Sequence, residues 1–518
     1  MGDELDAAAR HAPATTALAF GDRSWSFPAW NRASLGFAGE VARAVGSGER
    51  VAVLARNHPT VALALSAVPR AGRVLVLPNW RHHPAEVADS LVDVGVSLLV
   101  GTSELVNPVL AEFERRADPA PSSWPLPGID ELAAAAPLAD DLGRPAQRVH
   151  DAAWIIHTSG TTGTPKGVVL THASLLAGAT TALFGRPVQS SDTYLYPFPL
   201  CHVSAHNVLA HHLARRPVVL AERFDPGLFW EQARRWGATT ASLAPTMLAM
   251  LLDDPETASV PPGTLRAIGY GASAITPELL TESAQRLGCD LAGGYGMTEA
   301  SGNAVFLDAA THRDALVGRR ELLASAGFPG PLTRVRISPI PGGETGAAEV
   351  ASGVVGQIEL AGPQVAAGYW NRPDATATTF GTDGWLRTGD LGRLDADGRL
   401  WVTDRLKDLV ITGGENVSAR EVELVLAGHP AVKAVAVVGA PDDRWGEVVT
   451  AVVVPRDGHP LDPAAVRAHA RTALAGFKVP KRVEVVDALP HSANGKVDKV
   501  ALRAQLQPPP PPPPRSGD

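Results

Sequence analysis

The chain has 518 residues, which is too long for one ordinary hydrophobic core, so we expect two or more domains. Charged residues make up 19% and hydrophobic residues 45%, and the net charge of −8 excludes a broad basic surface for nucleic acid. The cysteines, Cys201 and Cys289, lack metal-ligand spacing, so we expect no disulfide framework or zinc site and a reducing, cytoplasmic location. Neither a signal peptide nor a membrane span is expected, because no apolar run reaches about 18 residues.

The first part of the chain alternates helix-like segments with strands. The apolar runs 51–56 and 74–78 indicate strands of a βαβ pattern. Residues 118–148 are rich in Pro and Ala, and we interpret them as a surface connection. Further βα units follow, which together predict a substantial α/β domain. The helices expected in these later units lie near 229–236 and 277–287.

The pattern changes after about residue 335. Short strands with turns follow, and the pairs Asp383-Gly384 and Asp397-Gly398 suit hairpins, which predicts a smaller β-rich subdomain. From residue 406 to 503 an independent α+β pattern predicts a further domain. It contains strand candidates at 432–441 and 449–455 and a helix near 463–474, and the chain ends in a Pro-rich tail that we expect to be disordered.

A Gly- and Thr-rich loop at residues 158–167, with the sequence TSGTTGTPKG, follows an apolar strand-like segment. Glycines let backbone N–H groups approach phosphate oxygens, hydroxyl groups donate further hydrogen bonds, and Lys166 supplies a positive charge. The loop is not a Walker A loop, because Pro165 precedes the lysine and Gly167 follows it. The composition therefore indicates a polyphosphate site of another kind.

A second Gly-rich segment, GYGASA at 269–274, fits the dinucleotide pattern G-x-G-x-x-A after a strand-like run. An NAD-dependent oxidoreductase is therefore a remote alternative. The competing interpretation is a strand end that needs small residues beside a ligand or a helix. We favour that interpretation, because a single fingerprint is weak evidence for a nicotinamide site.

Five motifs in one order carry a resemblance. They are TSGTTGTPKG at 158–167, GYGMTE at 294–299, TGD at 388–390, DRLKDLVITGGENV at 404–417 and NGK at 494–496. Together they resemble the adenylate-forming superfamily of acyl-CoA synthetases, peptide-synthetase adenylation domains and luciferases, over roughly residues 15 to 505. Within it the chain is most similar to 4-chlorobenzoate–CoA ligases and fatty-acid–CoA ligases. The resemblance implies an ATP-dependent carboxylate–CoA ligase that forms an acyl-AMP and then a thioester.

The resemblance also implies an α/β fold with a particular domain order. A large N-terminal domain of two α/β subdomains plus a β-rich subdomain is expected at 1–404, and a small mobile α+β domain at 408–505. The small domain swings about a hinge at 405–407, where Lys407 falls at the hinge position. The remaining residues, 506–518, form the tail.

The nucleotide site follows from the same resemblance. Because a carboxylate attacks the α-phosphorus of ATP, two anions must be brought together, and Lys496 and Lys166 are the expected catalytic cations. Glu299 and Thr158 are expected to hold Mg2+, which prefers oxygen ligands and phosphates. The expected nucleotide-binding residues are Thr158, Ser159, Gly160, Thr161, Thr162, Gly163, Lys166, Gly294, Tyr295, Gly296, Met297, Thr298, Asp390, Arg405 and Lys496.

The acceptor and the acid are implied by two further segments. CoA is the expected acceptor, with Trp445 and Phe477 at aromatic positions that match aryl-CoA ligases, although Val479 stands where those ligases have a phosphate-binding arginine. The expected CoA-binding residues are Gly413, Gly414, Glu415, Trp445, Phe477 and Lys478. The segment 198–207 lacks the aspartate that pairs with an α-ammonium group, so the acid is expected to be aryl, aliphatic or alicyclic. Its expected pocket comprises His202, Val203, Gly271, Ala272 and Met297, with His202 orienting the carboxylate.

Two alternatives stay open at this point. The acyl-AMP could be delivered to a carrier protein in place of CoA, and the chain could act as a monomer or as a homodimer. The acid itself and the pathway do not follow from the residues.

Overall fold

The structure is a computed structural model. It describes residues 1–136, 148–158, 165–261, 263–273, 275–340, 348–413, 415–442, 444–456, 458–459, 461–491 and 497–506. The chain divides into two compact units. The first comprises Met1–Arg336, Glu359–Thr388 and Leu394–Trp401, and the second comprises Ile337–Ile358, Gly389–Arg393 and Val402–Asp518.

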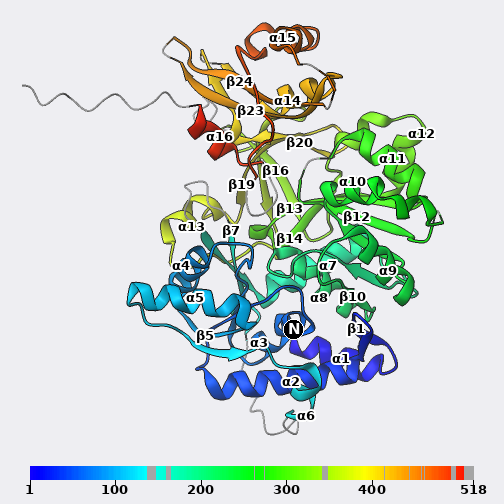
Figure 1. The fold of residues 1–518 in the computed structure, drawn as a ribbon, viewed down its shortest axis with the longest axis vertical. Coiled ribbons are helices and arrows are strands. Elements are labelled where there is room, and N and C mark those ends of the chain that lie inside the picture. Colours follow the sequence, from blue (N-terminus) through cyan, green and yellow to red (C-terminus); the bar gives the residue numbers. More distant parts are fainter. Residues whose placement is uncertain are drawn as a thin grey trace, which may run out of the picture. The chain divides into compact units, whose positions relative to one another are not determined.

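The first unit contains two large, mostly parallel sheets. Parallel strands need helical crossovers, and the helices in Figure 1 follow the strands in this alternating manner. One sheet has the order β15-β14-β13-β12-β11-β9-β10-β1-β2 and the other the order β18-β8-β7-β4-β3-β5-β6. The nine-stranded sheet comprises β1 Thr16–Phe20, β2 Arg23–Ser26, β9 Tyr194–Tyr196, β10 Val218–Leu220, β11 Thr240–Leu243, β12 Ala267–Gly271, β13 Asp290–Met297, β14 Gly302–Leu307 and β15 Phe328–Pro329. The seven-stranded sheet comprises β3 Arg50–Leu54, β4 Val74–Val76, β5 Val96–Gly101, β6 Ser122–Pro125, β7 Ala152–Thr158, β8 Lys166–Thr171 and β18 Gly368–Tyr369.

The helices of this unit begin where their sequences provide caps. Thr171 and Ser174 form a reciprocal capping box, each side-chain oxygen accepting from the other's backbone N–H at 3.0 Å, so α7 starts directly after β8. The helices are α1 Gly2–His11, α2 Phe27–Ala44, α3 Pro59–Arg70, α4 Pro84–Val94, α5 Ser103–Arg116, α6 Ile129–Ala134, α7 His172–Gly185, α8 His206–Leu213, α9 Pro226–Trp236, α10 Pro245–Asp253, α11 Pro277–Leu287, α12 Ala309–Val317 and α13 Pro373–Phe380. Short 3-10 helices are η1 Val203–Ala205, η2 Pro255–Ser259, η3 Thr298–Ala300 and η4 Arg320–Ala324.

The two faces of the nine-stranded sheet differ in chemistry. Alternate residues of β11 and β12, such as Ala241, Ile268 and Tyr270, pack into a hydrophobic core with residues of α9, α10 and α11. Side chains alternate along a strand, so Ser242 and Gly269, which pair in register, lie on the opposite face. That face therefore carries small and polar residues.

A third sheet has the order β16-β17-β19-β20. Its strands are β16 Arg334–Ser338, β17 Gly356–Ala361, β19 Leu386–Leu394 and β20 Leu400–Arg405. The second unit contains a five-stranded sheet, in which β23 and β24 form a long antiparallel pair. The elements of the second unit from residue 406 onward are η5 Leu406–Asp408, β21 Val410–Thr412, β22 Glu415–Val417, α14 Ala419–Ala427, β23 Val432–Asp442, β24 Gly446–Pro455, α15 Pro463–Arg471, η6 Gly476–Lys478, β25 Arg482–Val485 and α16 Lys499–Gln505.

These elements confirm the α/β class, and they also correct two local predictions. The segment 118–148 contains β6 and α6 and is not only a connection, because a short Pro-containing strand can still pair at the edge of a sheet beside β5. The pair Asp383-Gly384 lies between α13 and β19 and forms no hairpin. The pair Asp397-Gly398 does connect two strands, β19 and β20. Of the predicted tail, 506–518, residues 507–518 lie outside the described residues. The domain boundary predicted at residue 404 stays a prediction.

Candidate active site

The predicted phosphate loop joins two paired strands. Strands β7 and β8 run antiparallel, and Thr158 pairs in register with Lys166, so the ends of the loop are held side by side. The Nζ atom of Lys166 lies 5.1 Å from the ring centroid of Tyr369. Residues 159–164 of the loop lie outside the described part of the chain, and they include the predicted Ser159, Gly160, Thr161, Thr162 and Gly163.

Tyr369 connects this strand pair to Glu299. The tyrosine hydroxyl donates a hydrogen bond of 2.9 Å to Oε1 of Glu299, whose residue is 7% exposed. Burial and the nearby Glu299 carboxylate raise the pKa of Tyr369, so its hydroxyl stays protonated and remains a donor. Lys166, Tyr369 and Glu299 thus form one contiguous polar group within the first unit.

Tyr369 was missed by the sequence analysis. The residue lies in β18, which pairs with β8 although 200 residues separate them, as the register pair Tyr369 and Val168 shows. A tyrosine in a Gly-Tyr-Trp run carries no local sign of such a pairing.

The donor set at Glu299 is compatible with Mg2+. Carboxylate and hydroxyl oxygens are hard ligands, and Mg2+ is commonly held by one or two carboxylates together with substrate phosphates. Among the described residues no group of three or more His, Cys, Asp or Glu could hold a metal, so phosphate oxygens would have to supply most of the ligands. Glu299 and Thr158 therefore suit a nucleotide-bound magnesium better than a metal held by protein alone.

Backbone geometry explains the glycines of the 294–299 segment. Strand β13 pairs with β14, and a Cβ atom at Gly294 would lie 2.7 Å from Cγ of Asn303. The predicted Tyr295 and Gly296 follow in the same strand, and Met297 ends it immediately before η3, which carries Thr298 and Glu299. The close packing of β13 and β14 thus positions η3 beside Tyr369, in the polar group that includes Glu299.

The predicted acid-binding segment is anchored by Asn57. The amide of Asn57 donates to the carbonyl oxygens of Phe198 at 2.7 Å and Ala221 at 2.9 Å, and its Oδ1 accepts from the N–H of Leu200 at 2.9 Å. This buried asparagine, which the sequence analysis also missed, fixes the turn that leads to His202. His202 is the N-cap of η1, and Val203 begins that helix.

The acid-binding segment approaches the other two pocket segments. The His206 ring accounts for the glycine at position 302, because a Cβ there would lie 2.6 Å from Cε1 of His206. A Cβ at Gly271 would lie 2.7 Å from the carbonyl oxygen of Gly294. The structure thus gathers the predicted segments at 202, 271 and 294 at one end of β12 and β13.

The residue after Gly271 has an unusual backbone. Ala272 has φ of 69°, in the left-handed region that L-residues rarely occupy, and such strain is concentrated at functional sites. Gly269 and Gly271, the glycines of the dinucleotide-like pattern, are both explained by close packing, Gly269 against Arg186 and Gly271 against Gly294. The small-residue interpretation of GYGASA fits these contacts.

Asp390 and Arg405, both predicted to bind the nucleotide, form an ion pair within the second unit. The Nε atom of Arg405 lies 3.2 Å from Oδ1 of Asp390. The Asp390 side chain is 13% exposed, whereas the Arg405 side chain is 51% exposed. A largely buried carboxylate beside a guanidinium can accept hydrogen bonds from the hydroxyl groups of a ligand.

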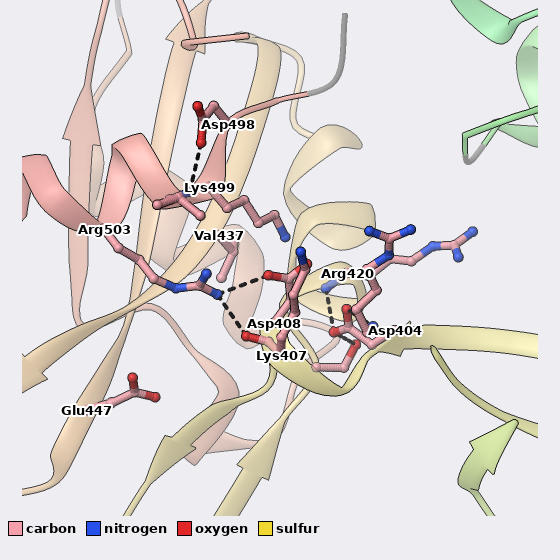
Figure 2. A network of polar contacts seen from close by, with 12 residues as sticks. Asp404, Lys407, Asp408, Arg420, Val437, Glu447, Asp498, Lys499 and Arg503 are labelled. Carbon is pink, nitrogen blue, oxygen red and sulfur yellow. Dashed lines mark hydrogen bonds and ion pairs between the residues drawn. The ribbon is translucent and has the colours of Figure 1, made fainter. Parts of the chain in front are cut away.

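The predicted hinge residue has a tethered backbone (Figure 2). Arg503 in α16 donates to the carbonyl oxygen of Lys407 at 3.2 Å and to Oδ1 of Asp408 at 3.0 Å. Burial, followed by the Arg405 charge, lowers the pKa of Lys407. Nearby, Asp404 accepts from the hydroxyl of Ser418 and from the backbone N–H of Arg420, as Figure 2 also indicates for Arg420. The segment 404–408 is therefore held by the N-terminal end of α14 and by the side chain of Arg503 in α16.

The predicted CoA-binding residues have different surroundings. Gly413, with φ of 61°, lies against Trp445, and the Nζ atom of Lys481 lies 3.6 Å from the Trp445 ring centroid. Lys478 contacts both carboxylate oxygens of Glu421, at 2.8 and 2.7 Å, so its charge is already compensated. Trp445 and Phe477 are 39% and 41% exposed, which leaves their rings accessible to a ligand. Glu415 starts β22, whereas Gly414 and the predicted catalytic Lys496 lie outside the described residues.

Comparisons with known proteins identify families whose members this chain resembles. A family described as AMP-binding enzyme matches residues 5–370, and one described as AMP-binding enzyme C-terminal domain matches residues 421–496. A feruloyl-CoA synthase from Amycolatopsis sp is 37% identical over 501 residues, covering 96% of this chain and 97% of that protein. The fatty acid–acyl-carrier-protein ligase ScoC from Streptomyces coeruleorubidus is 36% identical over 504 residues, covering 96% and 94%.

A solved structure of similar extent is the o-succinylbenzoate CoA synthetase of Bacillus subtilis in complex with its acyl-adenylate intermediate. It superposes with a TM-score of 0.83 at 31% identity and covers 97% of both chains. The same enzyme has been solved with ATP and a magnesium ion, at a TM-score of 0.82 and 30% identity, covering 97% of this chain and 98% of that one. Among the described helices of this chain, none is long and apolar enough to cross a membrane.

Proposed function

This chain belongs to the AMP-binding enzyme family and is an ATP-dependent carboxylate–CoA ligase, and we propose that its acid carries an aryl group. The predicted membership of the adenylate-forming superfamily and of its CoA-ligase branch is thereby confirmed, as is the AMP-forming acid–thiol ligase class.

In the first step a carboxylate oxygen attacks the α-phosphorus of ATP, and pyrophosphate leaves. Two anions meet in this step, so we assign Lys166 and Lys496 to the developing charge on phosphate and carboxylate. Mg2+ would supply a further positive charge at the phosphates when bound, and Glu299 is the carboxylate suited to hold it. Tyr369 orients Glu299 through its hydrogen bond of 2.9 Å. Asp390 and Arg405 bind the ribose.

In the second step the CoA thiol attacks the acyl carbonyl and AMP leaves. Trp445 is assigned to the adenine of CoA, because its ring is partly exposed and an adjacent cation, Lys481, can attract phosphate. Gly413 lets the ligand approach the backbone, and we place the hinge at Lys407. A cytoplasmic location, where ATP and CoA are plentiful, is part of the proposal.

The single observation that supports an aryl acid best is the identity to feruloyl-CoA synthase along nearly the whole chain. The face of the sheet that carries Gly271 fits this assignment. On this face Tyr194 and Tyr196 lie beneath η1 and α8, and aromatic rings suit a flat substrate. The segment 198–207 holds no carboxylate for an amino acid substrate.

A carrier-protein acceptor is the second candidate, because the similarity to a fatty acid–acyl-carrier-protein ligase also extends over nearly the whole chain. The two candidates share the adenylation step and differ only in the thiol. The partly exposed Trp445 beside Lys481 favours CoA, because its ring could stack on the adenine of CoA. The phosphopantetheine arm of a carrier protein has no adenine to stack there.

The test is pyrophosphate release from ATP and Mg2+ with phenylpropenoic, benzoic, arylacetic and fatty acids, with and without CoA, followed by mass measurement of the product. Turnover of an aryl acid to its CoA thioester, at least about 10-fold faster in kcat/KM than any fatty acid, supports the proposal. Fatty acids used as well as aryl acids contradict the aryl assignment, and an acyl-adenylate that forms without a thioester favours the carrier protein.

A further inference from the structure

Arg186 is a partly buried cation whose guanidinium group contacts Asn207 at the end of the predicted acid-binding segment. It follows directly after α7, and its Nη1 donates to Oγ of Ser242 at 2.9 Å while its Nη2 donates to Oδ1 of Asn207 at 2.9 Å. The Nε atom is buried and has no hydrogen-bond partner. A guanidinium group has five N–H donors, so the contacts to Ser242 and Asn207 leave several of them unused.

Nothing among the described residues neutralises this charge. In the described part of the chain no carboxylate forms an ion pair with Arg186, and the carboxylate of Asp192 pairs with Arg266 at 2.5 Å. Burial lowers the pKa of the Arg186 guanidinium. The surrounding ionisable groups are neutral. Burial raises the pKa of Tyr194 and lowers the pKa of His206 to about 4 and of His211 to about 3. A buried charge without a counter-charge is costly unless a ligand compensates it.

The position of Arg186 links it to the acid pocket. Its Cδ atom would lie 2.9 Å from a Cβ at Gly269, so the arginine occupies the space that this glycine leaves on the face of the sheet shared with Gly271. Gly269 lies two residues before Gly271 in β12, or roughly 7 Å farther from the strand end at 3.3 Å per residue. Arg186 is therefore deeper than the residues expected around the carboxylate.

The residues that hold Arg186 also continue into the acid-binding segment. Asn207 donates to the carbonyl oxygen of Ser204 at 2.9 Å, and Nδ1 of His206 lies 2.8 Å from the carbonyl oxygen of Val203. The Nε2 atom of His206 is a second buried polar atom without a partner. Two unsatisfied buried donors or acceptors thus flank one side of η1 and α8, whereas most buried polar groups in proteins are satisfied.

We propose that Arg186 determines specificity by binding an electronegative oxygen at the far end of the acid, such as a ring hydroxyl, a phenolate or a second carboxylate. This inference rests on the proposed function and names the substituent that distinguishes good from poor acids. An oxygen acceptor would meet the unused N–H groups, and a site built to hydrogen-bond a substrate oxygen rejects analogues that lack it far more strongly than an apolar pocket does.

The competing explanation is a structural one, in which Arg186 only ties β11 to α8. Both explanations predict that removing Arg186 destabilises the protein. They differ in the ratio of kcat/KM for two acids in direct competition, because that ratio does not depend on how much of the enzyme is folded.

The experiment measures this ratio for 4-hydroxycinnamate against 4-methylcinnamate, which have similar shapes, and then for 4-carboxycinnamate against the methyl compound. Hydroxylamine traps the acyl-adenylate, so the result does not depend on the acceptor. The wild type is compared with Arg186→Met and Arg186→Lys. Arg73→Met is the matched control, since Arg73 is a buried arginine whose Nε and Nη2 are bound by the carbonyl oxygens of Val45 and Ala42.

The wild type is expected to prefer one of the oxygen-bearing acids by at least about 10-fold, and the two ratios distinguish a neutral hydroxyl from a carboxylate. Arg186→Met should reduce the preference to within about 2-fold, with Arg186→Lys between them and Arg73→Met like the wild type. An unchanged ratio in Arg186→Met overturns the inference. If that variant yields no active protein, the wild-type ratio decides, and equal use of the methyl compound overturns the inference. Failure of the proposed function is distinct, because then fatty acids give trapped adenylate at least as fast as the cinnamates do.

Discussion

Arg405 and Asp390 form an ion pair, with Nε of the arginine 3.2 Å from Oδ1 of the aspartate. The two residues are 15 positions apart in the sequence, and both were predicted to bind the nucleotide. The pairing orients a carboxylate to which two hydroxyl groups of a nucleotide could donate.

Asp390→Asn is expected to raise the KM for ATP by about 10- to 100-fold. A hydrogen bond to a charged acceptor is worth about 1.5–3 kcal/mol, and an amide oxygen is a weaker acceptor than a carboxylate. Steady-state pyrophosphate release at varied ATP measures the effect. Asp397→Asn is the control, because this aspartate lies in the turn between β19 and β20 with a side chain that is 72% exposed. Equal KM values for the two variants would refute the ribose assignment.

Tyr369→Phe is expected to weaken magnesium-nucleotide binding while leaving the fold intact. The change removes the hydrogen bond to Glu299 but keeps the ring beside Lys166. We expect the Mg2+ concentration for half-maximal rate to rise by about 3- to 10-fold, as expected when about 1 kcal/mol of orientation is lost. Titration of Mg2+ at fixed ATP measures it.

The matched control for Tyr369→Phe is Tyr270→Phe. The hydroxyl of Tyr270 lies 2.7 Å from Nε2 of His312, on the face of β12 that packs into the hydrophobic core. Tyr270→Phe should lower stability without changing the Mg2+ requirement. A similar shift in both variants would mean that Tyr369 acts only through stability.

The residues that sequence reasoning found and missed differ in kind. Lys166 was found because its Gly- and Thr-rich run indicates phosphate chemistry, whereas Glu299 and Asp390 were found because their motifs resemble those of the adenylate-forming superfamily. Tyr369 and Arg186 were missed because their roles arise from pairing between distant segments, β18 with β8 and the end of α7 with β11. Only the fold brings such residues together.

Secondary structure shows the same limit. The helix expected at 277–287 agrees with α11, because local signals mark both of its ends. Thr276 caps the N-terminus, and Gly288 follows the last helical residue. Strand β6 was not expected, because a four-residue edge strand that ends in proline has almost no pattern of its own.

Acid is expected to destabilise the first unit through buried histidines of α8. Burial lowers the pKa of His206 and His212 to about 4 and of His211 to about 3, from an ordinary value of 6.5. The unfolded chain therefore binds more protons than the folded chain below about pH 6.5. The stability contributed by the neutral rings is fully present above that pH and is lost as pH falls toward the folded values, at on the order of 1–2 kcal/mol per histidine near pH 5.

His212→Gln tests this pH dependence. The Nε2 atom of His212 lies 3.1 Å from the carbonyl oxygen of Ala17, and a glutamine amide can still donate there but does not titrate. Urea unfolding at pH 7.5 and pH 5 should show a smaller loss of stability in the variant than in the wild type. Identical losses would contradict the assignment to His212.

Trp445→Ala is expected to raise the KM for CoA by about 10- to 100-fold. Stacking of a nucleic acid base on an aromatic side chain is worth about 1–3 kcal/mol. Pyrophosphate release without CoA should stay within about 2-fold of the wild type, which provides an internal control. A loss of adenylation equal to the loss of thioester formation would show that Trp445 serves folding and not CoA.

The most direct test of the central claim follows an oxygen atom. The best acid of the panel is labelled with 18O in its carboxylate and incubated with the enzyme, ATP, Mg2+ and CoA. If the carboxylate attacks the α-phosphorus and the CoA thiol then displaces AMP, one labelled oxygen must appear in AMP for each acyl-CoA formed, and we predict this result. Label in orthophosphate with ADP as the other product, or unlabelled AMP, would contradict the adenylate mechanism.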